Sequence, residues 1–178
     1  MAFKFNGTTI APNYTVKYNG TALKKIIYNG VTVWEPYYYI FKNGNTASSI
    51  FQGIRVNGFG LTKDYKWQSA GNVSNSGNNL VVQGNSGTYS SVFSINKINL
   101  TNYTKAIIVV TALDNGSNGG EIRAGFTTSN ADSYTGTYKT ISKGTITIDI
   151  SSLSGSYYLA FAIVGETKIT ISNIYLSA

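Results

Sequence analysis

The final stretch of the chain, residues 144–178, constrains the fold more than any other. Its first part alternates isoleucine with polar residues, as a strand with one buried and one exposed face does: Ile146, Ile148 and Ile150. Residues 157–164 are apolar in both phases, which is typical of a strand covered on both sides. In residues 169–176 the alternation shifts at Ser172 and Asn173, which predicts a β-bulge. The stretch therefore predicts three antiparallel strands that close one layer of an all-β domain.

Short strands continue this pattern upstream, separated by connections rich in Gly, Asn and Ser. They are expected at residues 37–42, 49–56, 80–83, 88–95, 105–113, 122–126 and 137–141. Residues 105–113 are apolar on both faces and predict an interior strand, whereas residues 70–79 read as a long surface connection. Regular spacing of so many strands predicts a two-sheet sandwich. One shared core is expected to contain Ile107, Val109, Ile146, Ile148, Ile150, Leu159, Phe161 and Ile163.

The N-terminal part repeats an aromatic residue followed by Asn-Gly, at Tyr18 and Tyr28 and also at Phe5. Asn and Gly both tolerate the positive φ of a tight hairpin turn, so a small β-meander is predicted, with strands at 14–18, 22–28 and 31–34. Pro36 ends this pattern because proline cannot donate to a strand ladder. We expect residues 1–36 to form a hairpin-rich attachment module and residues 37–178 to form the main domain.

Composition excludes much chemistry. The chain has no Cys and no His, which removes thiol nucleophiles, the usual zinc sites and imidazole bases. Its seven acidic residues show no strand-anchored pair of the kind that glycoside hydrolysis requires. We therefore expect a protein without enzymatic activity or a cofactor.

The net charge of +7 would permit binding to acidic polymers, but the basic residues are scattered and only Lys24 and Lys25 are adjacent. This pattern favours a solvated surface over nucleic-acid binding. No apolar run approaches the ~20 residues of a membrane span, and no apolar leader follows Met1. The sequence therefore predicts a protein that is made in the cytosol and is not inserted into a membrane.

Residues 18–35, YNGTALKKIIYNGVTVWE, resemble an N-terminal segment of tail and other virion proteins from phages of gut and clostridial Firmicutes. The resemblance implies location in a virion that is released by lysis. It also implies that residues 1–36 contact other virion proteins.

Residues 37–178 resemble the jelly-roll fold of carbohydrate-binding modules and galactose-binding-like domains. The resemblance lies in an aromatic opening strand, the loop from Trp67 to Gly71, the hairpin TIDISSLSGSYY and the final ISNIYL. It implies that the opening strand pairs near the closing one. Many such modules carry Asp before the Asn of the last strand, near a structural calcium ion. Ser172 stands there in this chain, so calcium is not supported.

Sugar recognition needs an exposed aromatic ring and nearby planar polar groups. Trp67 is the first candidate, with Tyr65, Asp64, Gln68 and Asn72 close in sequence. The alternative for Trp67 is a place at the edge of the core. Tyr134 and Tyr138 flank Gly136 in a second polar loop. Tyr37, Tyr38 and Tyr39 must divide between the two faces of one strand, and we expect at least one of them in the core.

Three functions remain open. The first is a non-enzymatic, tail- or baseplate-associated virion protein whose jelly roll binds host-surface glycan, as a homo-oligomer and most plausibly a trimer. The second is a structural decoration or fibre protein without glycan binding. The third is a free-standing carbohydrate-binding module, which the start of the chain at Met1 without a catalytic partner makes less favoured.

Overall fold

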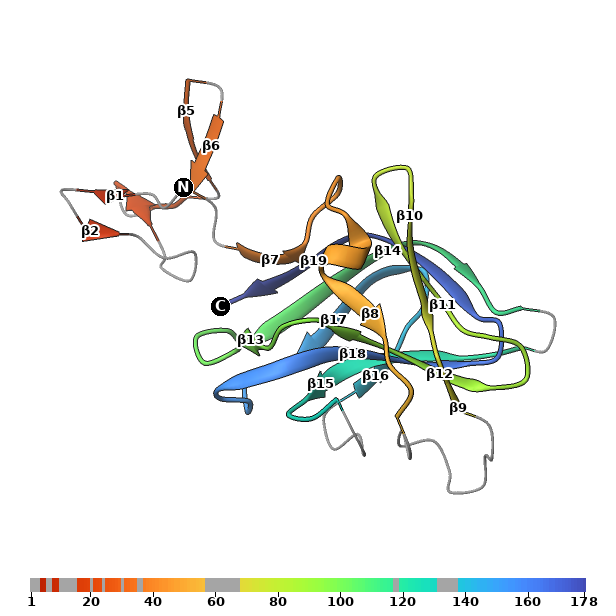
Figure 1. Ribbon diagram of the computed structural model, residues 1–178. Coiled ribbons are helices and arrows are strands. Elements are labelled where there is room, and N and C mark those ends of the chain that lie inside the picture. The colour runs from red at the N-terminus through yellow and green to blue at the C-terminus, as the bar shows by residue number, and fades with distance from the viewer. Residues whose placement is uncertain are drawn as a thin grey trace.

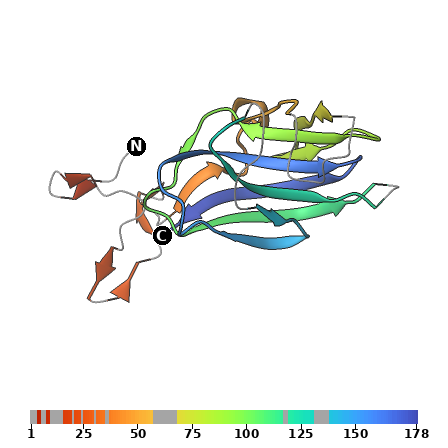
Figure 2. The same ribbon diagram turned by 90° about the horizontal axis from the view of Figure 1, so that it is seen from below.

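The computed structural model describes residues 4–5, 8–9, 16–19, 21–23, 25–29, 31–34, 37–56, 68–116, 119–130 and 138–178. Within these ranges the regular structure is β-strand apart from one short 3-10 helix, η1 (Ala47–Ser49). Two large sheets face each other (Figure 1), and their strands run broadly along the length of the sandwich (Figure 2). The predicted all-β, jelly-roll sandwich is confirmed. Nowhere in the described part of the chain is a helix long and apolar enough to span a membrane.

The first sheet has six strands. Five of them lie in the order β10 (Asn72–Ser76), β11 (Asn79–Gln83), β19 (Lys168–Ser177), β14 (Lys105–Asp114) and β17 (Gly144–Asp149). The sixth, β7 (Tyr37–Phe41), pairs with the end of β19, and Tyr37 lies opposite Ser177. The predicted pairing of the opening and closing strands is therefore confirmed. The interior position of β14, between β19 and β17, is confirmed as well.

The second sheet has seven strands. Five lie in the order β16 (Tyr138–Thr140), β15 (Ile122–Thr127), β18 (Ser156–Val164), β12 (Tyr89–Ser94) and β8 (Phe51–Gly53). Two short strands join it: β13 (Ile98–Asn99) pairs with β18, and β9 (Gln68–Ala70) pairs in parallel with β12. One edge of β12 is thus shared between β8 and β9.

The last three strands do not form one layer, so that prediction is wrong. β17 and β19 belong to the six-stranded sheet, and β18 between them belongs to the seven-stranded sheet. The connection after β17 crosses the end of the core: Ile150 is fully buried and Leu153 packs against the same core. A tight hairpin would have left both side chains outside, and burying each contributes about 1.5–3 kcal/mol.

The core between the sheets contains six of the eight residues predicted for it: Ile146, Ile148, Ile150, Leu159, Phe161 and Ile163. The prediction for Ile107 and Val109 is wrong, because β14 presents the opposite phase to the core. In that phase Ala106 lies opposite Ile148 and Ile108 opposite Ile146. Since β14 is apolar in both phases, alternation alone did not distinguish its two faces.

The predicted bulge in the last strand is confirmed. Asn173 lies opposite Val109 and Ile171 opposite Val110, so Ser172 is the extra residue on β19. The prediction of a long surface connection at residues 70–79 is wrong, since β10 and β11 form a hairpin around Gly77, which has φ +57°. β10 is an edge strand whose side chains are mostly exposed, and its polar sequence concealed it.

Three short hairpins precede the sandwich. They are β1 (Lys4–Phe5) with β2 (Thr8–Thr9), β3 (Lys17–Tyr18) with β4 (Thr21–Ala22), and β5 (Ile26–Tyr28) with β6 (Val31–Trp34). Asn19 and Asn29 have φ +47° and +48°, as predicted for their turns. The predicted meander is replaced by separate hairpins, because residues 22–28 divide between β4 and β5. The boundary at Pro36 stays a prediction.

Candidate functional site

Three tyrosines form a cluster on the outer face of the six-stranded sheet. The ring centroids of Tyr37 and Tyr175 are 4.8 Å apart, those of Tyr39 and Tyr175 are 5.6 Å apart, and those of Tyr37 and Tyr39 are 6.5 Å apart. All three pairs are tilted or edge-on, the geometry that aromatic rings prefer. Tyr37 keeps 37% of its surface exposed, whereas Tyr39 and Tyr175 are half-buried.

Local sequence explains this placement. Side chains alternate along β7, so Tyr37 and Tyr39 share the outer face and Tyr38 takes the other. On β19 the core residues Ile174 and Leu176 flank Tyr175, which therefore points outward. The predicted division of the three β7 tyrosines between two faces agrees with this arrangement. The expectation that one of them belongs to the core is wrong, since none is buried; Ile40 and Phe41 fill that role.

The register of the sheet extends the cluster across four strands. Tyr39 lies opposite Tyr175, Tyr175 opposite Ile107, and Ile107 opposite Thr147. Three strand spacings of about 4.8 Å make this row roughly 14 Å long. Ile107 is buried within the row at 8% exposure, and Thr147 at its end is exposed. A parallel row, one pleat along, contains Asn173, Val109 and Thr145.

Polar groups lie at the side of the cluster where β7 ends. The Lys42 ammonium is 4.8 Å from the centre of the Tyr39 ring, a cation–π contact. The backbone amide of Asn43 donates a hydrogen bond to Asn173 Oδ1 (3.3 Å), and Asn43 Nδ2 donates to Asn79 Oδ1 (3.2 Å). These bonds fix the loop after β7 against the sheet. Partial burial, and to a lesser degree the neighbouring Tyr37, raises the pKa of Tyr175, so its hydroxyl stays protonated at neutral pH.

We use the term tyrosine face for Tyr37, Tyr39, Tyr175, Asn173 and Thr147. It combines aromatic rings, an amide and a hydroxyl on strands of one sheet. Sheet strands hold side chains more rigidly than loops do, so the arrangement is set before a ligand arrives. Such a surface can stack apolar C–H groups on its rings while its amide and hydroxyl bond to ligand hydroxyls.

The outer face of the seven-stranded sheet is built differently. Its middle carries buried residues that form a second, smaller apolar cluster: Val56, Phe93, Ala160 and Ala162. Val56 belongs to this cluster and Ile54 packs against it; Ile54 is fixed to Ser91, whose hydroxyl donates to the Ile54 carbonyl while its carbonyl accepts from the Ile54 amide at 3.1 Å. The aromatic and small apolar residues at the middle of this face are therefore buried.

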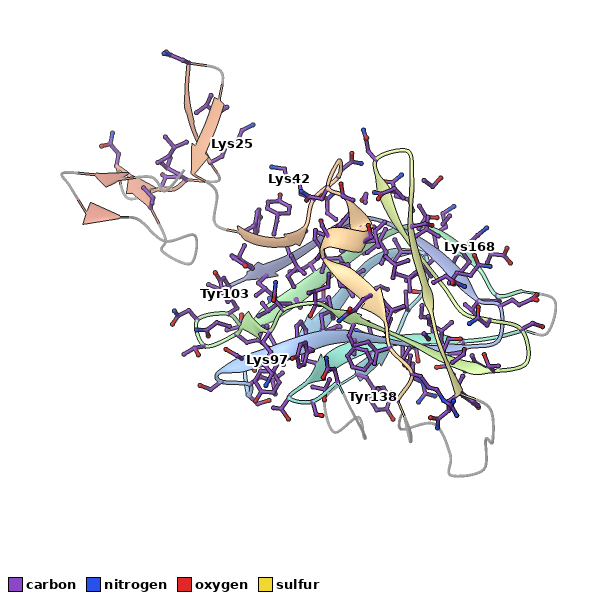
Figure 3. All side chains as sticks on the ribbon, viewed as in Figure 1. Lys25, Lys42, Lys97, Tyr103, Tyr138 and Lys168 are labelled. Atoms are coloured by element: carbon purple, nitrogen blue, oxygen red, sulfur yellow. The ribbon has the colours of Figure 1, made fainter. Side chains whose placement is uncertain are left out.

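The structure describes three of the predicted site residues, Gln68, Asn72 and Tyr138, and Tyr138 lies apart from the other two. Trp67, Tyr65, Asp64 and Tyr134 lie outside the described residues. Gln68 is half-buried on β9, and its buried Oε1 has no hydrogen-bond partner among the described residues, whereas Asn72, on β10 of the other sheet, donates from Nδ2 to Asn85 Oδ1 at 2.8 Å. Tyr138 lies on β16, at the opposite edge of the seven-stranded sheet from β9. Figure 3 shows Tyr138 far from Lys42, which marks the tyrosine face.

Tyr138 belongs to a charged cluster of its own. Its ring, 44% exposed, lies 5.2 Å from the Arg123 guanidinium. Arg123 Nε donates to Glu121 Oε1 at 2.6 Å and Nη2 donates to Oε2 at 3.2 Å, and the Thr140 hydroxyl also donates to Glu121. The hydrogen bond from Arg123 lowers the pKa of Glu121. This arrangement presents one exposed ring beside an ion pair.

Three of the four described carboxylates make local hydrogen bonds or ion pairs. Asp114 accepts from the Gly116 amide, Asp149 accepts from the Ser151 amide and hydroxyl, and Glu121 binds Arg123. Across the described ranges, no three His, Cys, Asp or Glu side chains come close enough to hold a metal ion. The absence of a cofactor and the absence of enzymatic activity both stay predictions.

Comparison with solved structures identifies the fold. Two variants of a family 29 carbohydrate-binding module, one lysine-to-alanine and one aspartate-to-alanine, resemble this chain with TM-scores of 0.51 and 0.50. They are 16% and 20% identical in sequence, and the match covers 79% of this chain and 91% and 83% of theirs. No protein-family model and no curated protein matches the sequence. At this identity the likeness establishes a shared sandwich fold.

The tyrosine face was not predicted, although the sequence already indicated both the strand pairing and the tyrosines that form it. The pairing of the opening and closing strands was expected, and the opening strand carries consecutive tyrosines while the closing one carries Tyr175. Combining the two observations would have placed aromatic rings side by side on one sheet. The predicted candidates came from loops instead, because loops carry binding residues more often than strands do.

Proposed function

We propose that this protein is a non-catalytic carbohydrate-binding module that holds a glycan chain on the tyrosine face. The observation that carries the proposal is the cluster of Tyr37, Tyr39 and Tyr175, which is partly exposed on the outer face of the six-stranded sheet. On the outer face of the seven-stranded sheet, by contrast, the central apolar residues are buried. The fold shared with family 29 carbohydrate-binding modules supports it. Pyranose rings present C–H groups on their faces, which stack on aromatic rings much as other apolar surfaces do.

The face suits a chain of sugars better than a single one. The row from Tyr39 to Thr147 spans about 14 Å, so it is longer than one sugar ring. Each ring contact is weak, and a linear glycan gains affinity by making several contacts at once. The amide of Asn173 and the hydroxyl of Thr147 would orient the chain, and Lys42 borders the rings.

Binding to a panel of polysaccharides tests the proposal directly. The purified protein is mixed with soluble and insoluble plant and bacterial cell-wall polysaccharides, and retention is measured in affinity gels and pull-downs. We expect the wild type to bind at least one polysaccharide, and Tyr39→Ala combined with Tyr175→Ala to weaken binding by at least about tenfold. Tyr138→Ala, which removes a more exposed tyrosine on the other sheet, should bind like the wild type.

Trp67→Ala distinguishes the tyrosine face from the loop site predicted from sequence. Loss of binding in Trp67→Ala at an unchanged melting temperature, with the tyrosine variants unaffected, would move the site to the loop. Loss in the tyrosine variants alone supports the tyrosine face. A wild type that binds no polysaccharide in the panel would contradict the module itself.

The biological setting rests on a different observation, the resemblance of residues 18–35 to virion proteins. On that resemblance the module would attach to a phage particle through residues 1–36, bind host glycan and form a trimer. A carbohydrate-binding module without a virion role accounts for the fold at least as well. Mass spectrometry of purified phage particles tests the setting, and a protein found only in the soluble fraction of the lysate would contradict it.

A further inference from the structure

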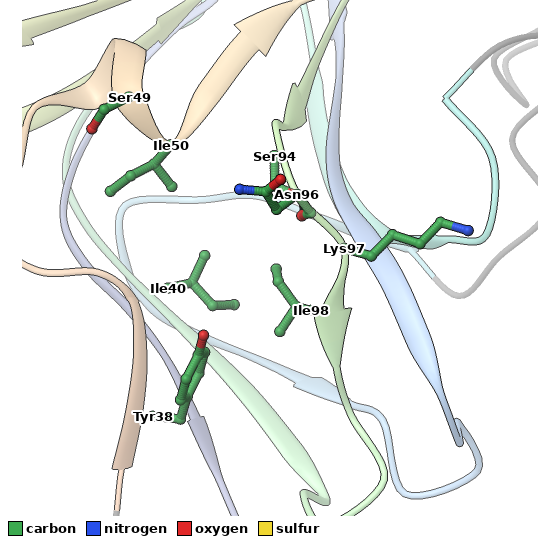
Figure 4. A pocket seen from close by; sticks show the side chains of 8 residues that line it. All are labelled: Tyr38, Ile40, Ser49, Ile50, Ser94, Asn96, Lys97 and Ile98. Carbon is green, nitrogen blue, oxygen red and sulfur yellow. The ribbon is translucent and has the colours of Figure 1, made fainter. Parts of the chain in front are cut away.

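A cavity of about 160 Å³ opens at one end of the sandwich, between the two sheets. Tyr38 and Ile40 come from β7 of the six-stranded sheet. Asn96 lies between β12 and β13 of the seven-stranded sheet, and Ile98 is the first residue of β13. Ile50 completes the apolar wall. Figure 4 shows Tyr38, Ile40 and Ile98 facing a common space with Asn96 and Ile50 across from them.

The cavity is separate from the tyrosine face. Tyr38 is on the opposite side of β7 from Tyr37 and Tyr39, and it is 45% exposed. Its ring centroid lies 6.1 Å from that of Tyr103, which packs against the core and supports the Tyr38 ring from outside the cavity. One strand therefore presents aromatic rings to two different places.

The polar groups around the cavity have unused hydrogen-bonding capacity. Within the described ranges, neither the Tyr38 hydroxyl nor the Asn96 side-chain amide has a hydrogen-bond partner. The Ser49 hydroxyl donates to the Thr46 carbonyl at 2.7 Å and can still accept. Lys97 also borders the cavity, but Figure 4 shows its side chain extending away, and its ammonium is 5.3 Å from the Tyr158 ring centre. The lining that faces the cavity is therefore uncharged.

Size and lining together restrict the ligand. At about 30 Å³ for each water, the cavity has room for about five waters, well below the 300–1,000 Å³ of a drug-sized pocket. Three isoleucines and one tyrosine ring offer apolar contact, and a hydroxyl and an amide offer bonds at the rim. A neutral molecule of one six-membered ring, with hydroxyls around its edge, matches both properties.

We propose that this cavity is a second glycan site, which binds one neutral pyranose residue end-on. The site would hold a terminal sugar while the tyrosine face holds the length of a chain. This site goes beyond the proposed function because it involves other residues and another ligand shape. Binding at the cavity can be tested independently of binding at the tyrosine face.

Nuclear magnetic resonance titration tests the site. Isotope-labelled full-length protein is titrated with methyl glycosides of glucose, galactose, mannose and N-acetylglucosamine, each to tens of millimolar. We expect at least one of them to shift the amide signals of Ile50, Asn96 and Ile98 with a dissociation constant on the order of 1 mM. No shift at these positions with any of the four would overturn the proposal.

Matched variants separate the two sites. Asn96→Ala and Tyr38→Phe each remove one hydrogen-bonding group at an exposed position, so we expect about a three- to tenfold weaker monosaccharide affinity. Lys97→Ala, at the neighbouring position with its side chain turned away, should leave the affinity unchanged. Polysaccharide binding at the tyrosine face should survive Asn96→Ala. Equal weakening by Lys97→Ala and Asn96→Ala, or an unchanged affinity in Asn96→Ala and Tyr38→Phe, would overturn the assignment.

Discussion

The outer faces of the two sheets differ in whether their aromatic side chains are buried or exposed. On the seven-stranded sheet Phe93 is 1% exposed and packs in an apolar cluster with Val56, Ala160 and Ala162. On the six-stranded sheet Tyr37 and Tyr39 remain partly exposed, and their rings contact one another and the ring of Tyr175. A sandwich needs only its inner faces to fold. Apolar residues on an outer face are therefore either covered by the chain or left for a partner.

Truncating one aromatic residue on each face should give the largest contrast. Phe93→Ala removes a fully buried ring and leaves a cavity, so we expect a loss of about 3–5 kcal/mol in the free energy of unfolding. Tyr39→Ala removes a half-buried ring and should cost less than about 1.5 kcal/mol. Urea unfolding of both variants measures the difference. Equal losses would mean that the tyrosine face is structural.

The backbones of Gly53 and Gly71 approach each other closely at the edge of the seven-stranded sheet. A Cβ at Gly53 would lie 2.0 Å from the Gly71 carbonyl oxygen, which real structures do not allow. Gly53→Ala should therefore displace residues 54–56 and destabilise the protein by about 2–3 kcal/mol. Gly77→Asn is the control, since φ +57° suits Asn and no atom lies within 4 Å of a Cβ there. Equal melting temperatures for Gly53→Ala and Gly77→Asn would contradict the packing at Gly53.

Deleting residues 1–36 tests whether the N-terminal hairpins are needed for the sandwich to fold. We predict that residues 37–178 fold without the N-terminal hairpins, and that the melting temperature stays within about 4 °C of the full chain. Calorimetry makes the measurement. Aggregation or loss of a cooperative melt would show that the hairpins belong to the core and that the boundary at Pro36 is misplaced.

The smallest expected effect concerns the ion pair beside Tyr138. Because Arg123 lowers the folded-state pKa of Glu121, the pair stabilises the protein above the ordinary glutamate pKa and this contribution is lost as pH falls through the lowered value. Glu121 is 37% exposed, so Glu121→Gln should cost only about 0.5 kcal/mol at pH 7. Unfolding measured at pH 7 and again near pH 3 should show this difference disappear. A difference that grows on acidification would contradict the assigned pair.

Sequence patterns predicted the strands whose two faces differ in polarity. Ile146, Ile148 and Ile150 alternate with polar residues, and the structure buries all three. The patterns failed where both faces are alike: β14 is apolar in both phases, so Ile107 was assigned to the wrong side. β10 is polar in both phases, so it was not recognised as a strand.

The candidate site was harder to predict than the fold, because it depends on neighbours that are distant in sequence. Tyr39 and Tyr175 become neighbours only through the register of β7 on β19, and the bulge at Ser172 sets which β19 residues point outward. Nothing in either segment alone distinguishes a binding tyrosine from a packing one. The site follows only when the pairing of β7 with β19 is combined with the positions of the tyrosines on both strands.

Mapping a bound oligosaccharide onto the two outer faces tests most directly whether the tyrosine face is the glycan-binding site. An oligosaccharide of the polysaccharide that binds is titrated into labelled protein, and shifts in the amide signals are assigned to strands. We expect shifts along β7, β19, β14 and β17 around Tyr39, Tyr175 and Thr147, with none along β15 and β16. Shifts concentrated around Arg123 and Tyr138, with the tyrosine face unchanged, would contradict it.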